Sequence, residues 1–278
     1  MIGNRFNRDY VENQLQKLST LLRRRTRIFV AGGAAMAFYG LKEATKDIDV
    51  VVEERSGLRL LVSALHKVGY AYPKHSLSVT YRRMRAKAIL ENSNGFRWDI
   101  FERVVANKLS LSGGMVERSR VIFNNAKLHV RSLSKEDIFL LKSVTERDFD
   151  LDDMRIVAES GIDWKTVKTE CHSQASRSER IWEDALCEKL IDLRERMSVV
   201  SPIEKSICRI ADQTILERWI VKKVGAGVNT VNDLAREAAE PKWVIRKALA
   251  ELVEKRDLVV KREGRLHTFG LTSRAKKS

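Results

Sequence analysis

The chain has 278 residues, of which 44% are hydrophobic and 32% charged, with only three prolines. This composition excludes a disordered or collagen-like chain and suffices for one large packed domain or two smaller ones. The charge excludes an acidic protein: Lys and Arg exceed Asp and Glu by 15 overall, with 25 against 13 in residues 1–140, 10 against 14 in 141–202 and 17 against 10 in 203–278. Two basic ends favour a polyanionic partner, most simply a nucleic acid.

The sequence shows no features of a secreted or membrane-spanning protein. The N-terminus is polar and charged, unlike a secretory signal. The longest apolar run, residues 29–41, contains three glycines and is too short to span a bilayer. The three cysteines lack the spacing of a zinc site. We therefore expect a cytoplasmic protein with no membrane partner.

The first seventy residues alternate between helix and strand. The spacing of apolar residues predicts, in chain order, a helix over 7–25, a strand over 28–31, a helix over 34–41, a strand over 48–52 and a helix over 58–68. The Gly32-Gly33 pair predicts the turn between the first strand and the second helix.

Two hairpins and a long helical region follow. The segments NSNG and NNAK predict turns, the first between strands over 86–91 and 96–101 and the second between strands over 121–123 and 128–130. Ser134 and Asp137 are close to a capping box, and the sequence from there to about Met197 is helical in pattern. We predict an α/β (α+β) fold with a mixed sheet and flanking helices, with a domain over residues 1–160 and a helical extension over 161–201.

A third part begins after Ser201-Pro202. The pattern predicts a helix over 203–224, a short helix from Thr230, a helix from Pro241 and a hairpin that turns at Glu263-Gly264. This is the outline of a winged helix-turn-helix over residues 202–278. The expected nucleic-acid contacts are four residues at the start of its recognition helix and one on the wing, namely Lys242, Trp243, Arg246, Lys247 and Arg262. A protein–protein interaction module is the alternative to nucleic-acid binding, and a core position is a separate alternative for Trp243.

The stretch with the clearest chemistry runs from Phe29 to Glu54. Asp47 and Asp49 are two residues apart at the start of a predicted strand, so their side chains lie on the same face. Two neighbouring carboxylates repel each other unless a cation lies between them, and Mg²⁺ binds carboxylate and phosphate oxygens together. Gly32 and Gly33 allow close backbone approach at the start of a helix, where N–H groups can hold a phosphate. The alternative is a solvated strand edge.

A third acidic residue is expected from a neighbouring strand. In GFRWDIFE, Asp99 is the acidic residue within the predicted strand, on the face opposite to Phe96, Trp98 and Ile100. Three carboxylates with Mg²⁺ or Mn²⁺ can position an attacking hydroxyl and a leaving pyrophosphate. We therefore predict Asp47, Asp49 and Asp99 as catalytic, metal-binding residues.

These motifs resemble a known superfamily. The stretch VAGGAAMAFYGLKEATKDIDVVV is similar to the signature of the DNA polymerase β nucleotidyltransferases, in which a strand, Gly-Gly or Gly-Ser, a helix and Asp-x-Asp follow one another. It looks most like the minimal nucleotidyltransferases, a group that includes toxins of toxin–antitoxin pairs. The resemblance covers roughly residues 10–160, and Gly33 stands where many members have serine.

The resemblance also implies nucleotide contacts. The segment LLKSVTERDFDLDDMRIV is similar to a family helix, which implies that Lys142 and Arg147 hold the triphosphate and that Asp150 and Asp153 brace them. Lys46, beside the first aspartate, is a further candidate for nucleotide binding. As alternatives, Lys142 is a surface lysine, and the aspartates are the acidic first turn of the next helix.

Taken together, the sequence predicts an enzyme that transfers NMP from an NTP to an acceptor hydroxyl. The basic surface favours RNA as the acceptor, the family resemblance suggests tRNA, and a protein acceptor is possible. A toxin-like role would add an antitoxin protein as partner. The alternative function is a DNA-binding regulator with a nucleotide-sensing, non-catalytic nucleotidyltransferase fold.

Overall fold

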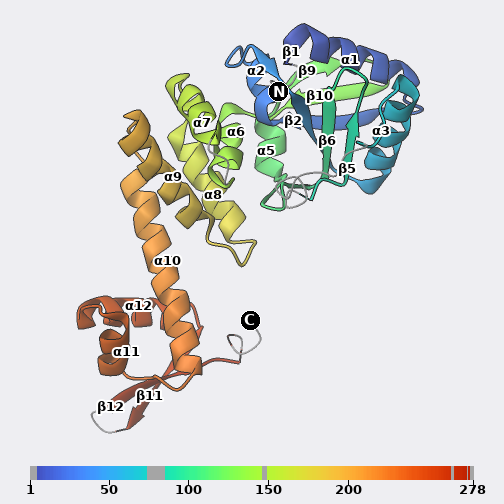
Figure 1. Ribbon diagram of the computed structural model, residues 1–278. Coiled ribbons are helices and arrows are strands. Elements are labelled where there is room, and N and C mark those ends of the chain that lie inside the picture. The colour runs from blue at the N-terminus through green and yellow to red at the C-terminus, as the bar shows by residue number, and fades with distance from the viewer. Residues whose placement is uncertain (1–4, 74–84, 146–148, 264–265, 274, 276–278) are drawn as a thin grey trace. The chain divides into compact units, whose positions relative to one another are not determined.

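The computed structural model describes residues 5–73, 85–145, 149–263, 266–273 and 275 (Figure 1). The chain divides into two compact units, Met1–Glu204 and Lys205–Ser278. Within the described residues, no helix is both long and apolar enough to cross a membrane.

A mixed sheet forms the centre of the first unit (Figure 1). Its order is β5-β6-β4-β2-β10-β9. The strands are β2 (Thr26–Ala31), β4 (Asp47–Val52), β5 (Ala88–Glu91), β6 (Arg97–Glu102), β9 (Arg120–Asn124) and β10 (Leu128–Ser132). β4 runs parallel to β6, β2 runs parallel to β10, and the other neighbours are antiparallel. The sheet is therefore mixed, as predicted.

The two predicted hairpins are confirmed, and each turn is held by an asparagine. Asn92 Oδ1 accepts hydrogen bonds from the backbone N–H groups of Asn94 and Phe96 between β5 and β6. Asn125 Oδ1 accepts from Lys127 and Leu128 between β9 and β10. Asparagine suits these places because its side chain can replace a backbone acceptor in a turn.

Helices α2 and α3 pack on the sheet, and helices α6 to α9 pack mainly on one another beside it (Figure 1). α1 packs against α3, and α2 packs against β4 and α6. The helices of this unit are α1 (Arg8–Leu21), α2 (Gly32–Phe38), α3 (Arg55–Val68), α5 (Gly113–Arg118), α6 (Lys135–Ser143), α7 (Phe149–Glu159), α8 (Trp164–Ala175) and α9 (Trp182–Met197). The region predicted as helical up to about Met197 consists of the four helices α6 to α9. Ser134 caps α6 by accepting from the Asp137 N–H, and Asp163 caps α8 by accepting from the Lys165 N–H.

Short elements were not predicted. They are β1 (Phe6–Asn7), which pairs with β3 (Ala44–Thr45), β7 (Val104–Val105), which pairs with β8 (Leu109–Ser110), and α5. The four strands have two residues each, too few to show the alternation of a strand, and the six residues of α5 cover fewer than two helical turns.

The second unit consists of helices followed by a hairpin, in the predicted order. Its elements are α10 (Glu204–Gly225), α11 (Val231–Ala238), α12 (Lys242–Glu254), β11 (Leu258–Glu263) and β12 (Leu266–Leu271). Ile245, Ala248, Leu249 and Leu252 of α12 are buried in one core with residues of α10 and α11. Thr230 caps α11 by accepting from the Asp233 N–H. The winged-helix assignment itself, and the division of the first unit at residue 160, stay predictions.

Candidate active site

Asp49 and Asp99 are register partners on adjacent parallel strands. β4 lies beside β6 so that Asp47 faces Arg97 and Asp49 faces Asp99. Residues two apart on a strand point to the same face, so these four side chains share one face of the sheet. Asp49 has partners on both sides, Ala31 of β2 and Asp99 of β6, so it does not lie on a sheet edge. The flanking Ile48, Val50 and Val51 are fully buried and hold β4 in place.

Gly32 lies directly beside the Asp49 carboxylate. It has a positive φ of 62°, and a Cβ added to it would lie 2.0 Å from Asp49 Oδ2. Only glycine avoids this clash, and glycine also adopts the left-handed backbone without strain. The sequence predicted close backbone approach at this turn, and the structure places the second aspartate there.

Arg97 lies between two of the predicted catalytic carboxylates. Its Nη2 donates to Asp47 Oδ2 at 2.5 Å, and its Nε donates to Asp99 Oδ1 at 2.8 Å. The Asp99 side chain is only 1% exposed and that of Arg97 15%. A buried carboxylate requires a partner of opposite charge, and Arg97 supplies one. The alternation of the strand put Arg97 and Asp99 on the same face but indicated no role for Arg97.

Lys142 is buried inside an ion-pair cluster. Its Nζ lies 2.8 Å from Asp150 Oδ1 and 2.6 Å from Asp153 Oδ2, and its side chain is 9% exposed. Burial alone would lower the pKa of the Lys142 ammonium, but the two carboxylates outweigh burial and raise that pKa. The same ion pairs lower the pKa of Asp153 against the effect of burial. The alternative in which Lys142 is a surface lysine is therefore wrong.

Lys42 connects this cluster to the glycine turn. Its Nζ lies 2.9 Å from both oxygens of Asp153, and its side chain is 35% exposed. A Cβ added to Gly33 would lie 3.7 Å from Lys42 Nζ and 3.1 Å from Thr45 Oγ1. Lys42 and Thr45 thus lie beside Gly33, the second glycine of the turn. Neither residue was predicted from the sequence, because only the fold brings α7 and the start of α2 together.

Three further residues were predicted to contact the nucleotide or to support that contact, namely Lys46, Arg147 and Asp150. Lys46 is exposed in the link between β3 and β4. Arg147 lies outside the described residues. Asp150 contacts Lys142 and also accepts a short hydrogen bond from Thr145 Oγ1. The chain therefore brings Lys142, Asp150 and Asp153 together, and it places Lys42 at their outer end.

The donor set has the chemistry of a divalent-cation site. Among the residues that the structure describes, no three His, Cys, Asp or Glu side chains are grouped around a common metal position. Oxygens of Asp47 and Asp99 do converge on one cationic group, the Arg97 guanidinium. Carboxylate oxygens are the ligands that Mg²⁺ and Mn²⁺ prefer, so the chemical type of these side chains suits such an ion.

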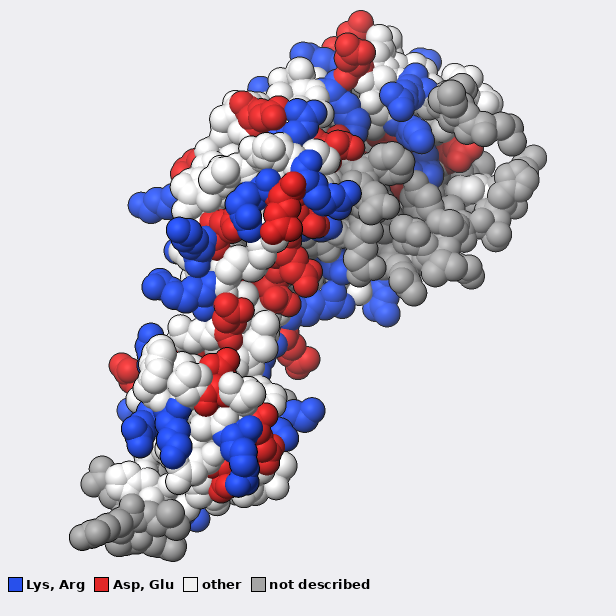
Figure 2. All heavy atoms as spheres, turned by 60° about the vertical axis from the view of Figure 1, so that its left-hand side comes forward, with Lys and Arg blue, Asp and Glu red and all other residues white. Residues whose placement is uncertain are grey.

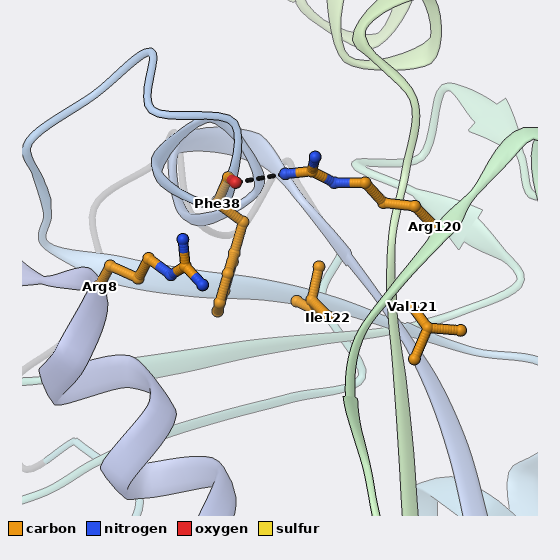
Figure 3. Close-up of a pocket in the computed structure, with 5 residues that line it drawn as sticks. All are labelled: Arg8, Phe38, Arg120, Val121 and Ile122. Atoms are coloured by element: carbon orange, nitrogen blue, oxygen red, sulfur yellow. Dashed lines mark hydrogen bonds between the residues drawn. The ribbon is translucent and has the colours of Figure 1, made fainter.

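A pocket of about 240 Å³ lies at the other end of α2 (Figure 3). Its described lining includes Arg8, Phe38 and Arg120, and Arg120 donates a short hydrogen bond to the Phe38 carbonyl. The Arg120 guanidinium also lies 3.7 Å from the centre of the Tyr39 ring. Phe38 ends α2, whereas Gly32 begins it, so this pocket is not part of the carboxylate site.

The predicted nucleic-acid residues lie on α12 and β11. Lys242, Trp243, Arg246 and Lys247 are all exposed, Trp243 by 68%, so the alternative that buries Trp243 in the core is wrong. Arg262 lies in β11, in register with His267. On the face shown in Figure 2, basic and acidic side chains are interspersed. This face therefore shows no continuous basic patch among the described residues (Figure 2), and nucleic-acid binding there must be argued from individual elements.

A comparison with known families bears on this geometry. The model of a family described as nucleotidyltransferase of unknown function (DUF6036) matches residues 9–198, more than half of the chain. The chain belongs to this family. The family description supports a nucleotidyltransferase, and hence a transferase enzyme, at a coarse level.

The nucleotidyltransferase region contains both parts of the candidate site. It spans the whole six-stranded sheet and the helices up to α9, including the Lys142 cluster. It extends beyond residue 160, where the sequence resemblance ends, so α8 and most of the helical extension belong to the same family region. No curated protein matches the chain.

Proposed function

We propose that the chain is a Mg²⁺-dependent nucleotidyltransferase that transfers NMP from an NTP to an acceptor hydroxyl. The observation that carries the proposal is the pairing of Asp49 with Asp99 on adjacent strands, next to Gly32 at the start of α2. This arrangement lies inside a region that belongs to a nucleotidyltransferase family.

The proposed reaction is an in-line displacement. The acceptor hydroxyl oxygen forms a bond to the α-phosphorus, the bond from that phosphorus to the oxygen bridging to the β-phosphate breaks, and pyrophosphate leaves with the bonding electron pair. The hydroxyl proton passes to a carboxylate, for which we propose Asp99. Asp47 and Asp49 would hold Mg²⁺, with Asp99 as a further ligand. The ion, when bound, neutralises phosphate charge and lowers the pKa of the hydroxyl.

The triphosphate would lie at the glycine turn. Gly32 and Gly33 present backbone N–H groups without side chains that would block a phosphate. Lys42 is the lysine best placed to contact phosphate there, because its Nζ is near Gly33 and its side chain is partly exposed. Lys142 is more enclosed and has two carboxylate partners, so we assign it to fixing Asp153, which in turn positions Lys42.

The acceptor is proposed to be RNA. The net charge of +15 favours a nucleic acid, and tRNA is the acceptor suggested by family resemblance. The exposed Lys242, Arg246 and Lys247 on α12 provide positive charge that suits phosphate contacts. A toxin-like role with an antitoxin partner is part of the same proposal.

A transfer assay tests the function. Purified protein is incubated with Mg²⁺, total cellular RNA and each NTP in turn, labelled at the α-phosphate, beside the Asp47→Ala/Asp49→Ala variant. Label that enters RNA, and is absent with the variant, would support the proposal and identify the base. Label in the protein fraction would change the acceptor class. Absence of transfer with every NTP would contradict the proposal.

A further inference from the structure

The carboxylates that we assign to the metal already contact a cation from their own chain. Arg97 is the register partner of Asp47 on the neighbouring strand and lies two residues before Asp99 on its own strand. Its guanidinium contacts both acids, with Nη2 2.5 Å from Asp47 Oδ2 and 3.3 Å from Asp99 Oδ2, and Nε 2.8 Å from Asp99 Oδ1. The planar fork of arginine is suited to such a bridge, since it can donate to two carboxylates at once.

Burial makes this contact important for the protein without metal. Asp99 is almost completely enclosed, and the Asp47 and Asp99 oxygens are close enough to share one guanidinium. Two like charges at this separation raise each other's free energy, and a buried carboxylate loses its hydration. The guanidinium offsets both costs. A divalent cation placed on the same oxygens would offset them as well.

Both cations cannot use the same oxygens. The guanidinium donates to Asp47 Oδ2 and Asp99 Oδ1, and a metal ligated by those atoms would meet a positive group at hydrogen-bond distance. Like-charge repulsion at this distance is large in a partly buried site. One cation must therefore leave when the other binds.

We propose that Arg97 is an internal counter-ion that competes with the divalent cation for Asp47 and Asp99. It stabilises the carboxylates when the metal is absent and thereby weakens metal binding. This inference rests on the proposed function, because it takes these acids as the metal ligands. Arg97 thus has a positioning role, and its contacts with the two carboxylates determine the Mg²⁺ concentration at which the site is filled.

The test measures Mn²⁺ binding by titration calorimetry without nucleotide, so that no catalytic activity is needed. The variants are Arg97→Gln, which removes the charge, and Arg97→Lys, which keeps the charge but not the fork. Arg103→Gln is the matched control, because Arg103 is an exposed arginine just after the same strand. Asp49→Asn tests the metal site itself.

We expect Arg97→Gln to bind Mn²⁺ about tenfold tighter than the unmodified protein or more, with Arg97→Lys intermediate and Arg103→Gln within about twofold. We also expect Mn²⁺ to raise the melting temperature of Arg97→Gln more than that of the unmodified protein. If Arg97→Gln does not fold, the comparison of Mn²⁺ affinity between Arg97→Lys and the unmodified protein decides, and tighter binding by Arg97→Lys supports the proposal.

The possible failures are distinguishable. Equal Mn²⁺ affinities in the unmodified protein and both Arg97 variants, with binding lost in Asp49→Asn, would overturn the counter-ion role and leave the proposed function intact. Weaker Mn²⁺ binding in the Arg97 variants would also overturn it, since Arg97 would then support the metal. Absence of saturable Mn²⁺ binding in every protein would overturn this inference together with the proposed metal site.

Discussion

Lys142 and Asp153 form an ion pair of 2.6 Å, in which the lysine side chain is only 9% exposed. Asp153 also accepts from Lys42, which comes from the loop after α2, more than a hundred residues earlier in the chain. The pair joins α6 to α7, and the contact of Asp153 with Lys42 ties both helices to the loop between α2 and β3.

Removing the buried ammonium should destabilise the protein strongly. In Lys142→Met, Asp150 and Asp153 lose their enclosed partner, and breaking one side of a buried ion pair costs about 3–5 kcal/mol. Urea unfolding at neutral pH would measure the free energy of unfolding. Lys165→Met, at an exposed position of α8, is the control and should change it by less than about 0.5 kcal/mol. Equal effects of the two substitutions would show that the cluster is not a stabilising one.

The stabilising effect of Asp153 should depend on pH in a defined direction. Ion pairs with Lys142 and Lys42 hold the pKa of Asp153 below its ordinary value, even though burial raises it. A carboxyl with a lowered pKa in the folded state stabilises the fold fully above its unfolded-state pKa of about 4, and this contribution is lost as the pH falls through the folded-state pKa.

The measurement compares the unmodified protein with Asp153→Asn from pH 7 down to pH 3. The difference in unfolding free energy should be largest near neutrality and should shrink below about pH 4. Asp152→Asn, at the exposed neighbouring residue, should give a small difference throughout. A difference for Asp153→Asn that stays constant over this range would contradict the assignment.

Alanine substitutions at Gly32 and Gly40 distinguish the effect of backbone strain from the effect of a clash with Asp49. Both have positive φ, but a Cβ on Gly40 would meet nothing within 4 Å, whereas one on Gly32 would lie 2.0 Å from Asp49 Oδ2. Gly40→Ala should cost about 1–2 kcal/mol of stability, as the left-handed backbone requires, and should leave transfer activity unchanged. Gly32→Ala should lower the activity at least about a hundredfold, because the carboxylate must move. Similar activity in the two variants would mean that the position of Asp49 is not critical.

The basic start of α12 should contribute to nucleic-acid binding. Replacing Lys242, Arg246 and Lys247 together by Ala should weaken binding and reduce the slope of log affinity against log salt by about one for each phosphate that the protein no longer neutralises. The control replaces Lys205, Arg209 and Lys222, three exposed cations of α10, and removes the same charge. Fluorescence anisotropy with labelled RNA and duplex DNA, at several salt concentrations, would measure the affinity and its salt dependence for both triple variants. Equal weakening in the two triple variants would indicate a general charge effect without a site on α12.

The sequence predicted the local parts of the candidate site because they depend on short-range patterns. Asp47 and Asp49 share a face through the two-residue period of a strand, and the asparagine-containing segments NSNG and NNAK indicated the hairpins. The register that sets Asp49 opposite Asp99 was not predictable, because it depends on the order of strands in the sheet. The role of Arg97 was missed because its contact with Asp47 depends on the pairing of β4 with β6. The role of Lys42 was missed because its partner Asp153 lies on α7, far along the chain.

The most direct test of the central claim follows both ends of the same NTP. Reactions with the nucleotide labelled at either the α- or the γ-phosphate are run with the unmodified protein, Asp49→Asn, and Glu43→Gln as an exposed carboxylate control. We predict that the α-label enters the acceptor, that the γ-label appears in pyrophosphate in equal amount, and that Asp49→Asn alone loses both. Transfer of the γ-label to the acceptor, or α-label transfer that survives in Asp49→Asn, would contradict nucleotidyl transfer at these carboxylates.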